Sequence, residues 1–154
     1  MTEHDGFIGI ALDEARSGLA AGEQPFGAVI VRDGAVIVQS RSLKVSTGDS
    51  TAHAELLAIR DATTALGTRT LPGCTFYGTC EPCPMCLGAM FNAGIEKLVL
   101  GARLAELGDL AFAFKDYSVE AFAAMTGWRL DLVEGVRLEE CTALYVDTAV
   151  KFSR

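Results

Sequence analysis

Two short segments constrain the fold of this chain more than any other feature. One is Thr51-Ala52-His53-Ala54-Glu55, and the other is Cys80-Glu81-Pro82-Cys83-Pro84-Met85-Cys86. Zinc in proteins prefers cysteine sulfur and histidine nitrogen, usually in a tetrahedral arrangement. If His53, Cys83 and Cys86 bind one zinc ion, the fold must bring these two segments together. A shared zinc site is therefore the central prediction from this sequence.

The number of available ligands indicates a catalytic zinc ion. A structural zinc has four protein ligands, whereas a catalytic zinc keeps one coordination position for water. Cys83 and Cys86 lie three residues apart at the start of a predicted helix, so both side chains can face one point. The unpaired N–H groups and the helix dipole at such a start favour thiolates.

Glu55 is the candidate catalytic residue for proton transfer. Zinc lowers the pKa of a bound water, and a nearby carboxylate can take the water proton and pass it to a ring nitrogen and then to a leaving amine. On an ideal helix, His53 and Glu55 would lie about 200° apart and would not share a face. The hypothesis therefore requires the metal to lie beyond the end of that helix, where a first-turn glutamate can reach it.

A Cys-x-x-Cys pair alone has two other interpretations, half of a structural zinc site or a redox pair. The sequence contains no separate second Cys pair to complete a structural site, since Cys80 only forms an overlapping Cys-x-x-Cys with Cys83, and a fourth thiolate from Cys80 would close the catalytic position. A redox pair leaves His53 and Glu55 unexplained. His4 is expected to be a solvated residue near the N-terminus. The remaining cysteines are expected to be small buried hydrophobic residues rather than ligands: Cys74, Cys80 and Cys141.

Hydrophobic periodicity and turn residues predict an alternation of helices and strands. An Asp33-Gly34 turn indicates a hairpin, Thr51 is expected to cap a helix that Gly67 ends, and Pro82 and Pro84 suit the start of another helix. In chain order, the prediction is a helix at 5–21, strands at 28–31 and 35–38, a loop at 39–51, a helix at 52–66, a strand at 75–79, a helix at 82–93, a strand at 97–100, an unassigned segment at 104–117, a helix at 119–125, a strand at 128–133 and a helix at 137–150.

This order predicts an α/β fold in which helices cover both faces of a mixed sheet. The chain has 154 residues, half of them apolar, which suits one domain with a sizeable core. No shift in composition divides it, so we expect a single domain over residues 1–154.

Charge and composition limit the partners. The formal net charge is −7, and the lysines and arginines form no run. Nucleic-acid-binding proteins gain most of their affinity by neutralising phosphates, so nucleic acid is not the expected partner. Signal-peptide features are absent from the N-terminal residues, and every apolar stretch is shorter than the ~20 residues that span a bilayer. We expect a cytoplasmic protein with no membrane association.

The pattern H-x-E…P-C-x-x-C is a signature of zinc-dependent base deaminases, and this chain resembles the cytidine deaminase-like superfamily. It looks most similar to the branch that holds guanine, fungal-type cytosine and tRNA adenosine deaminases. The resemblance covers about residues 7–150 and is carried by these segments: Pro25-Phe26-Gly27-Ala28, Thr51 to Glu55, Glu81 to Met90, Gly101-Ala102-Arg103 and Glu139-Glu140-Cys141.

The resemblance implies a three-layer α/β/α fold with a five-stranded mixed sheet, one catalytic Zn²⁺ per chain and a homodimer. It also implies that the heterocycle contacts the backbone of Phe26, Gly27 and Ala28 and the side chain of Glu81. In relatives, an asparagine that contacts the substrate commonly occupies the position of Ser42. Residues in the segment that closes the site in relatives are further candidate substrate contacts: Phe112, Phe114 and Asp116.

Three functional hypotheses follow. The first is hydrolytic deamination of a free nucleobase or a similar small heterocycle, of the guanine or cytosine type, which the acidic composition favours. The second is conversion of adenosine to inosine in tRNA. The third is a non-catalytic, zinc-stabilised subunit, which the presence of Glu55 argues against because a structural zinc needs no proton carrier.

Overall fold

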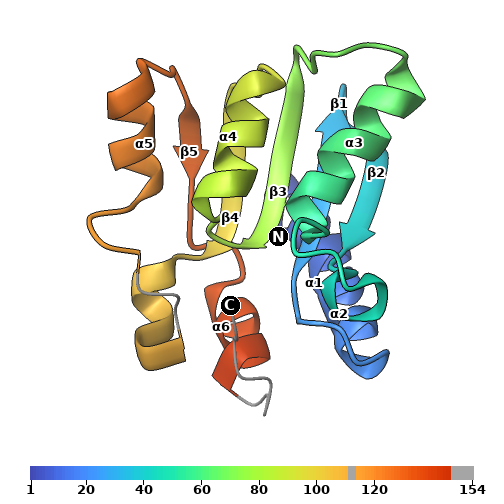
Figure 1. The fold of residues 1–154 in the computed structure, drawn as a ribbon, viewed down its shortest axis with the longest axis vertical. Coiled ribbons are helices and arrows are strands. Elements are labelled where there is room, and N and C mark those ends of the chain that lie inside the picture. Colours follow the sequence, from blue (N-terminus) through green and yellow to red (C-terminus); the bar gives the residue numbers. More distant parts are fainter. Residues whose placement is uncertain (111–113, 147–154) are drawn as a thin grey trace.

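The chain folds around one mixed sheet, and the computed structural model describes residues 1–110 and 114–146. The strands are β1 (Gly27–Arg32), β2 (Ala35–Arg41), β3 (Cys74–Cys80), β4 (Lys97–Ala102) and β5 (Asp131–Val133). They lie in the order β2-β1-β3-β4-β5 (Figure 1). β1 pairs antiparallel with β2 and β3, whereas β3–β4 and β4–β5 are parallel pairs. The predicted α/β class with a five-stranded mixed sheet is confirmed.

Helices cover both faces of this sheet and complete three layers (Figure 1). They are α1 (Glu3–Ala20), α2 (Lys44–Thr47), α3 (Ala54–Leu66), α4 (Pro84–Asn92), the 3₁₀ segment η1 (Leu104–Leu110), α5 (Val119–Thr126) and α6 (Leu138–Val146). Buried residues of α3, α4 and α5 pack on one face, and those of α1 and α6 pack on the other. None of the described helices is long and apolar enough to cross a membrane.

The central strands supply both hydrophobic cores by simple alternation. In β1, Ala28 and Ile30 pack toward α3 and α4, while Val29 and Val31 pack toward α1 and α6. Successive side chains of a strand point to opposite faces, so a strand covered on both sides is apolar at nearly every position. This explains why the sequence shows continuous apolar runs there instead of an alternating pattern.

Helix α1 begins two residues before the predicted start. The Thr2 hydroxyl accepts a hydrogen bond from the Asp5 N–H at 3.3 Å, and the Asp5 carboxylate accepts one from the Thr2 N–H at 2.5 Å. Such a capping box satisfies two N–H groups that the helix leaves free. The capping residues lie outside the apolar periodicity, so periodicity alone placed the start too late.

The segment 39–51, predicted as a loop, contains the end of β2 and the short helix α2. The buried carboxylate of Glu23 accepts hydrogen bonds from the N–H groups of Val45 and Ser46, both at 2.9 Å. A carboxylate at a helix N-terminus satisfies free N–H groups and is favoured by the helix dipole. Because this cap comes from a residue distant in sequence, local patterns could not reveal α2.

The last strand is shorter than predicted and starts after Trp128. The Trp128 N–H bonds back to Ala123 O at the end of α5, and its indole N–H donates to Ile95 O at 2.8 Å. Trp128 therefore belongs to the connection that packs against the core, and β5 covers only Asp131–Val133. Of the helix predicted for 137–150, the part beyond residue 146 lies outside the described residues.

Candidate active site

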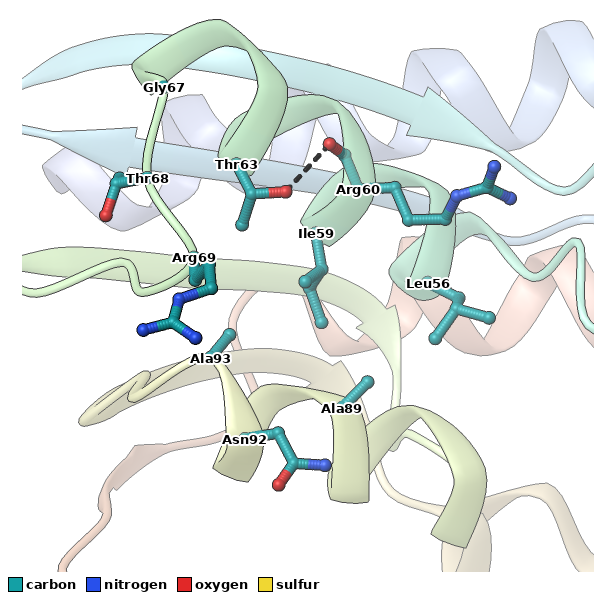
Figure 2. Close-up of a pocket in the computed structure, with 10 residues that line it drawn as sticks. All are labelled: Leu56, Ile59, Arg60, Thr63, Gly67, Thr68, Arg69, Ala89, Asn92 and Ala93. Atoms are coloured by element: carbon teal, nitrogen blue, oxygen red, sulfur yellow. Dashed lines mark hydrogen bonds between the residues drawn. The ribbon is translucent and has the colours of Figure 1, made fainter.

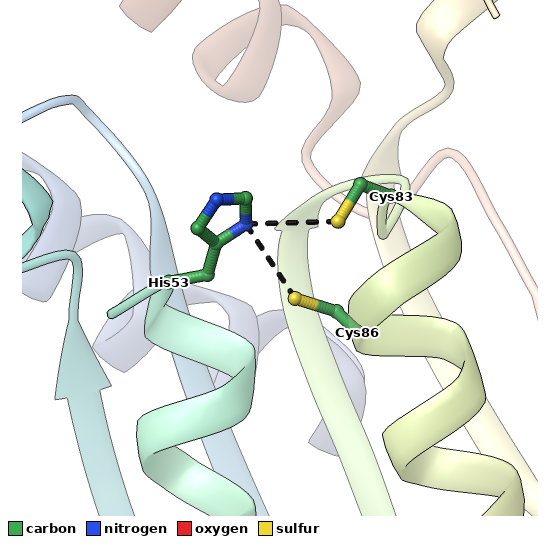
Figure 3. A group of neighbouring side chains, drawn as sticks. All are labelled: His53, Cys83 and Cys86. Carbon is green, nitrogen blue, oxygen red and sulfur yellow. Dashed lines mark hydrogen bonds between the residues drawn. The ribbon is translucent and has the colours of Figure 1, made fainter. Parts of the chain in front are cut away.

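The candidate site lies where two helices begin beside the carboxyl ends of parallel strands, the usual place for ligands in open α/β sheets. His53 is the N-cap of α3 and Cys83 is the N-cap of α4, and both have extended backbone, with ψ of 149° and 167°. Cys86 follows in the first turn of α4. Figure 3 shows the three side chains pointing toward one another.

The distances between these side chains suit a tetrahedral zinc. His53 Nδ1 lies 3.6 Å from Cys83 Sγ and 3.5 Å from Cys86 Sγ. Zinc bonds to nitrogen and sulfur, at ordinary lengths and tetrahedral angles, place these atoms about 3.5 Å apart. All the ligand atoms lie within 4.8 Å of one another. Among the described residues, His53, Cys83 and Cys86 form the one group of His, Cys, Asp or Glu side chains close enough together to hold a metal ion. One zinc ion fits the donor set that the sequence predicts.

The protein already holds one of the two thiols close to its metal-binding form. The hydrogen bond from Cys86, supported by His53, lowers the pKa of Cys83 to about 4. The same hydrogen bond and burial raise the pKa of Cys86, and the hydrogen bond with Cys83 raises the pKa of His53. Zinc binding therefore requires loss of the Cys86 proton, so metal affinity depends on pH.

Glu55 lies in the first turn of α3 with its carboxylate turned to the metal ligands. Its Oε2 accepts a hydrogen bond from Cys86 Sγ at 3.7 Å, and the residue is only 6 % exposed. Burial raises the pKa of Glu55 to about 7, so both its protonation states are accessible near neutral pH. Because His53 is the N-cap and not a helical residue, the ligand cluster lies off the end of the helix, as the proton-carrier hypothesis requires.

Glu81, the predicted substrate contact, is buried and surrounded by donors. Its Oε1 accepts from the Leu104 N–H at 2.9 Å, and its Oε2 accepts from the Val119 N–H and from Arg103 Nη2, both at 3.1 Å. Arg103 also pairs with Glu120 and Glu134. Glu81 belongs to residues 81–83, the metal loop, which leads from β3 into α4. Its carboxylate thus anchors to this loop the segments that follow β4 and precede α5.

The predicted backbone contacts at Phe26, Gly27 and Ala28 lie at the start of β1. The Gly27 N–H donates to Thr79 Oγ1 at 3.2 Å, and a Cβ at Gly27 would lie 1.8 Å from the carbonyl oxygen of Ala11. Gly27 therefore lets α1 approach β1 closely. Ala28 is fully buried in the core, and Phe26 is partly buried with its ring 5.5 Å from that of Tyr145.

Ser42 is buried at the end of β2, directly before α2. Its hydroxyl lies 3.5 Å from Ala52 O and 3.4 Å from the Lys44 N–H, at the long limit of hydrogen bonding. Leu43 N–H also donates to Ala52 O, at 3.0 Å. The loop carrying Ser42 is therefore laid along the residue that precedes the ligand His53.

Phe114 and Asp116 line a depression of about 520 Å³ beside Pro84, the first residue of α4. The ring of Phe114 meets that of Tyr117 edge to face at 5.4 Å, and the Tyr117 hydroxyl donates to Pro82 O. The depression is next to the metal loop, although no zinc ligand lines it. Phe112, the third candidate in this segment, lies outside the described residues.

A second hollow, of about 620 Å³, lies between α3 and α4 (Figure 2). Its floor includes Ile59 and Ala89, and Arg60 and Arg69 stand at its rim. Glu55 and the zinc ligands are not among the residues that line it. This hollow is part of the surface of the α3–α4 layer and not of the chemical site.

Sequence reasoning missed two polar residues around the site and misplaced a third. Glu23 holds α2, and Arg103 joins Glu81 to two other carboxylates. His4, expected to be solvated, is partly buried and its Nδ1 lies 2.9 Å from the Tyr77 hydroxyl. The buried cysteines Cys74, Cys80 and Cys141 are confirmed as core residues. Glu23 lies in the turn-rich, partly polar stretch Gly22-Glu23-Gln24-Pro25, so no local signal in the sequence indicates that its carboxylate is buried.

Comparison with known proteins agrees with this site. Residues 1–102 match the family model for the cytidine and deoxycytidylate deaminase zinc-binding region. A tRNA-specific adenosine deaminase from Bacillus subtilis is 38% identical over 92% of this chain and 85% of its own length. A guanine deaminase from the same organism is 42% identical over 71% of this chain and 70% of its own length.

A solved structure is similar over nearly its whole length. It comes from studies of A-to-I editing by tRNA:A34 deaminases at the wobble position of transfer RNA. It shares 37% sequence identity with this chain, covers 90% of this chain and 98% of its own, and superposes with a TM-score of 0.79. The fold is thus shared with this solved structure, and the relatives of the chain are named for different substrates.

Proposed function

The chain belongs to the family defined by the cytidine and deoxycytidylate deaminase zinc-binding region, and from this membership we propose its substrate class. It is a zinc-dependent hydrolase of the deaminase type. The proposed substrate is a free nucleobase or a similar small aminated nitrogen heterocycle, of the guanine or cytosine type. The products are the corresponding oxo-heterocycle and ammonia.

The chemistry divides between the metal and one carboxylate. His53, Cys83 and Cys86 would hold the zinc ion, which when bound would supply an activated water near neutral pH. Glu55 accepts the water proton on its carboxylate and donates it to a ring nitrogen of the substrate. It then moves the second proton to the leaving amine, which departs as ammonia. The buried position of Glu55 suits this role because burial raises the pKa of its carboxyl, which favours proton uptake by a group that must also release the proton.

The pairing of Arg103 supports a small ring over a polynucleotide. Arg103, the arginine bonded to Glu81, has its guanidinium enclosed by Glu81, Glu120 and Glu134. A guanidinium already paired with carboxylates has little left for a phosphate. The formal net charge of −7 acts in the same direction. A small neutral heterocycle needs no phosphate-binding surface.

The test is ammonia release by zinc-loaded protein. The panel contains guanine, cytosine, adenine, their nucleosides and aminotriazines, with the Glu55→Gln variant as the background control. We expect turnover of at least one free base and none by the variant. Absence of ammonia from every small substrate would overturn the proposal.

A second candidate, deamination of adenosine in tRNA, is favoured by one specific observation. The tRNA-specific adenosine deaminase noted above matches this chain over more of its length than the guanine deaminase does. Inosine formation in an anticodon stem-loop would support this candidate. If the stem-loop fails to bind even at low salt, where phosphate contacts are strongest, the candidate is excluded.

A homodimer, a cytoplasmic location and a single domain also remain proposals. The homodimer is supported by large apolar side chains exposed on or near α4 and α5: Met85, Phe91, Phe114 and Met125. Exposed apolar side chains gathered on one side often mark an interface. Sedimentation of the zinc-loaded protein at micromolar concentration decides this point, since a monomeric mass would contradict the homodimer.

A further inference from the structure

The chain between β4 and α5 is attached to the metal loop at three points. Glu81 Oε1 accepts from the Leu104 N–H, Glu81 Oε2 accepts from the Val119 N–H, and the Tyr117 hydroxyl donates to Pro82 O. Glu81 and Pro82 directly precede the zinc ligand Cys83. Both ends of the segment 104–119 are therefore fastened to the two residues that lead into the metal site.

The two backbone contacts of Glu81 are made at helix starts. Leu104 is the first residue of η1, and Val119 is the first residue of α5. N–H groups in a first turn have no partner within their helix, and the helix dipole favours a negative charge there. One carboxylate thus serves the N-termini of two successive helices.

Because the Glu81 carboxylate is buried, it depends on its protein donors rather than on water. The Glu81 side chain is 4% exposed, and its only cationic partner among the described residues is Arg103 at 3.1 Å. A buried carboxylate is tolerated when it is paired and hydrogen-bonded, and removal of its charge leaves the facing donors unsatisfied. With three donors on two oxygens, Glu81 has little capacity left to bind a substrate.

The segment that Glu81 fastens carries the aromatic pair beside the metal loop. Phe114 and Tyr117 stack edge to face at 5.4 Å and line the depression next to Pro84. Their position depends on where the ends of the segment are held. A shift of Leu104 or Val119 relative to Cys83 would move this aromatic wall relative to the zinc ligands.

We propose that Glu81 is a positioning residue that selects the substrate by fixing the Phe114–Tyr117 wall against the metal loop. This inference rests on the proposed function, because it assigns a role in the choice of heterocycle at the same site. Glu81 acts through the segment 104–119 and not by contact with the ring. It therefore governs substrate binding and ranking more than the chemical step.

The test compares Glu81→Gln with Glu120→Gln as a matched control. Both substitutions remove a carboxylate from Arg103. The Glu120 side chain, however, is 59% exposed and bonds no backbone amide of the described part of the segment. Amide hydrogen exchange at Leu104 and Val119 reports the fastening directly. Steady-state kinetics on the two best substrates of the panel report KM, kcat and the ratio of their kcat/KM values.

For Glu81→Gln we expect faster exchange at one or both amides, with zinc still at one per chain. KM should rise about tenfold and the substrate ratio should change, since a buried charge-assisted hydrogen bond is lost. The kcat should stay within about threefold, because the metal and Glu55 are untouched. Glu120→Gln should match the wild type in exchange and within about twofold in KM.

Three results would overturn this inference and leave the proposed function standing. They are unchanged amide exchange in Glu81→Gln, a fall in kcat with KM and substrate ratio unchanged, and loss of zinc with KM unaffected. If Glu81→Gln does not fold, Tyr117→Phe removes the third attachment and is expected to raise KM in the same sense; unchanged KM there would overturn the inference. A wild-type protein that releases no ammonia would instead overturn the proposed function as a whole.

Discussion

The metal centre and the rim of the site are held in place by different means. His53 and Cys83 are N-caps, so the local backbone at two helix starts aims them at one point. Ser42 and Glu81 are held by hydrogen bonds to residues ten to thirty-eight positions away in the sequence. The metal centre thus depends on local backbone geometry at two helix starts. The rim, by which we mean Ser42, Glu81 and the segments they hold, depends on tertiary contacts.

This difference separates what relatives share from what they can vary. Two helix starts on one sheet give the same metal geometry whenever the short motifs are present. The rim changes whenever a distant polar contact changes, without disturbing the metal. The chain is similar both to a tRNA-specific adenosine deaminase and to a guanine deaminase, which agrees with this division.

Loss of a zinc ligand should have the largest effect. Cys86→Ser should reduce zinc from one per chain toward zero and abolish ammonia release, because three ligands are the minimum for this site. Metal analysis and turnover measure both. Cys80→Ala is the matched control, since Cys80 is buried close to the site but lies outside the ligand cluster. Loss of zinc in that control would mean that Cys80 takes part in metal binding.

Glu55→Gln should have the next largest effect and should leave the metal in place. Removal of a general acid–base typically costs about 10²–10⁴-fold in rate, and zinc content should stay at one per chain. Turnover and metal analysis on the same sample check this. Unchanged turnover would remove Glu55 from the mechanism and would favour the hypothesis of a non-catalytic zinc subunit.

The metal centre was the more predictable of the two regions because its geometry is local. The Cys-x-x-Cys spacing at a helix start was sufficient to place Cys83 and Cys86 together. The link between His53 and Glu55 was harder, because an ideal helix would set them on different faces. The structure resolves the conflict through Thr51: its hydroxyl bonds to Asp49, and His53, not Thr51, occupies the N-cap.

The fold was predictable where periodicity and turn residues decide it, and the hairpin shows why. Asp33 and Gly34 both have positive φ, at 52° and 74°, as a tight hairpin turn requires. The roles of Glu23 and Glu81 were not predictable, because each caps a helix that no local signal connects to it. A buried acidic residue can be noticed in a sequence, but its donors come from other elements.

Glu23→Gln tests the support of α2, the helix that follows Ser42, and should have an effect of intermediate size. The substitution replaces one of two buried acceptors with an NH₂ group, which should lower the free energy of unfolding by about 1–3 kcal/mol. Denaturation with urea near neutral pH measures this loss. Turnover should fall far less than in Glu55→Gln, because α2 supplies neither a metal ligand nor the proton carrier.

The difference in unfolding free energy between the wild type and Glu23→Gln should also depend on pH. Burial raises the pKa of Glu23, but the hydrogen bonds from Ser46 and Val45 outweigh it and hold the pKa below its ordinary value of 4.5. A depressed pKa stabilises the fold above 4.5 and loses that contribution as the pH falls through the folded-state pKa. The stability gap between wild type and Glu23→Gln should therefore narrow below pH 4.5. A gap that widens there would contradict the capping role.

Ser42→Ala should have the smallest effect on stability and is the sharpest probe of the rim. The hydroxyl contacts at 3.4 and 3.5 Å are long, so their loss should cost less than about 1 kcal/mol. If Ser42 also contacts the substrate, KM should rise severalfold while thermal stability hardly changes. If KM and stability stay together at wild-type values, Ser42 only packs the loop against Ala52, and the substrate is chosen on the opposite side of the rim, at the wall that Glu81 holds.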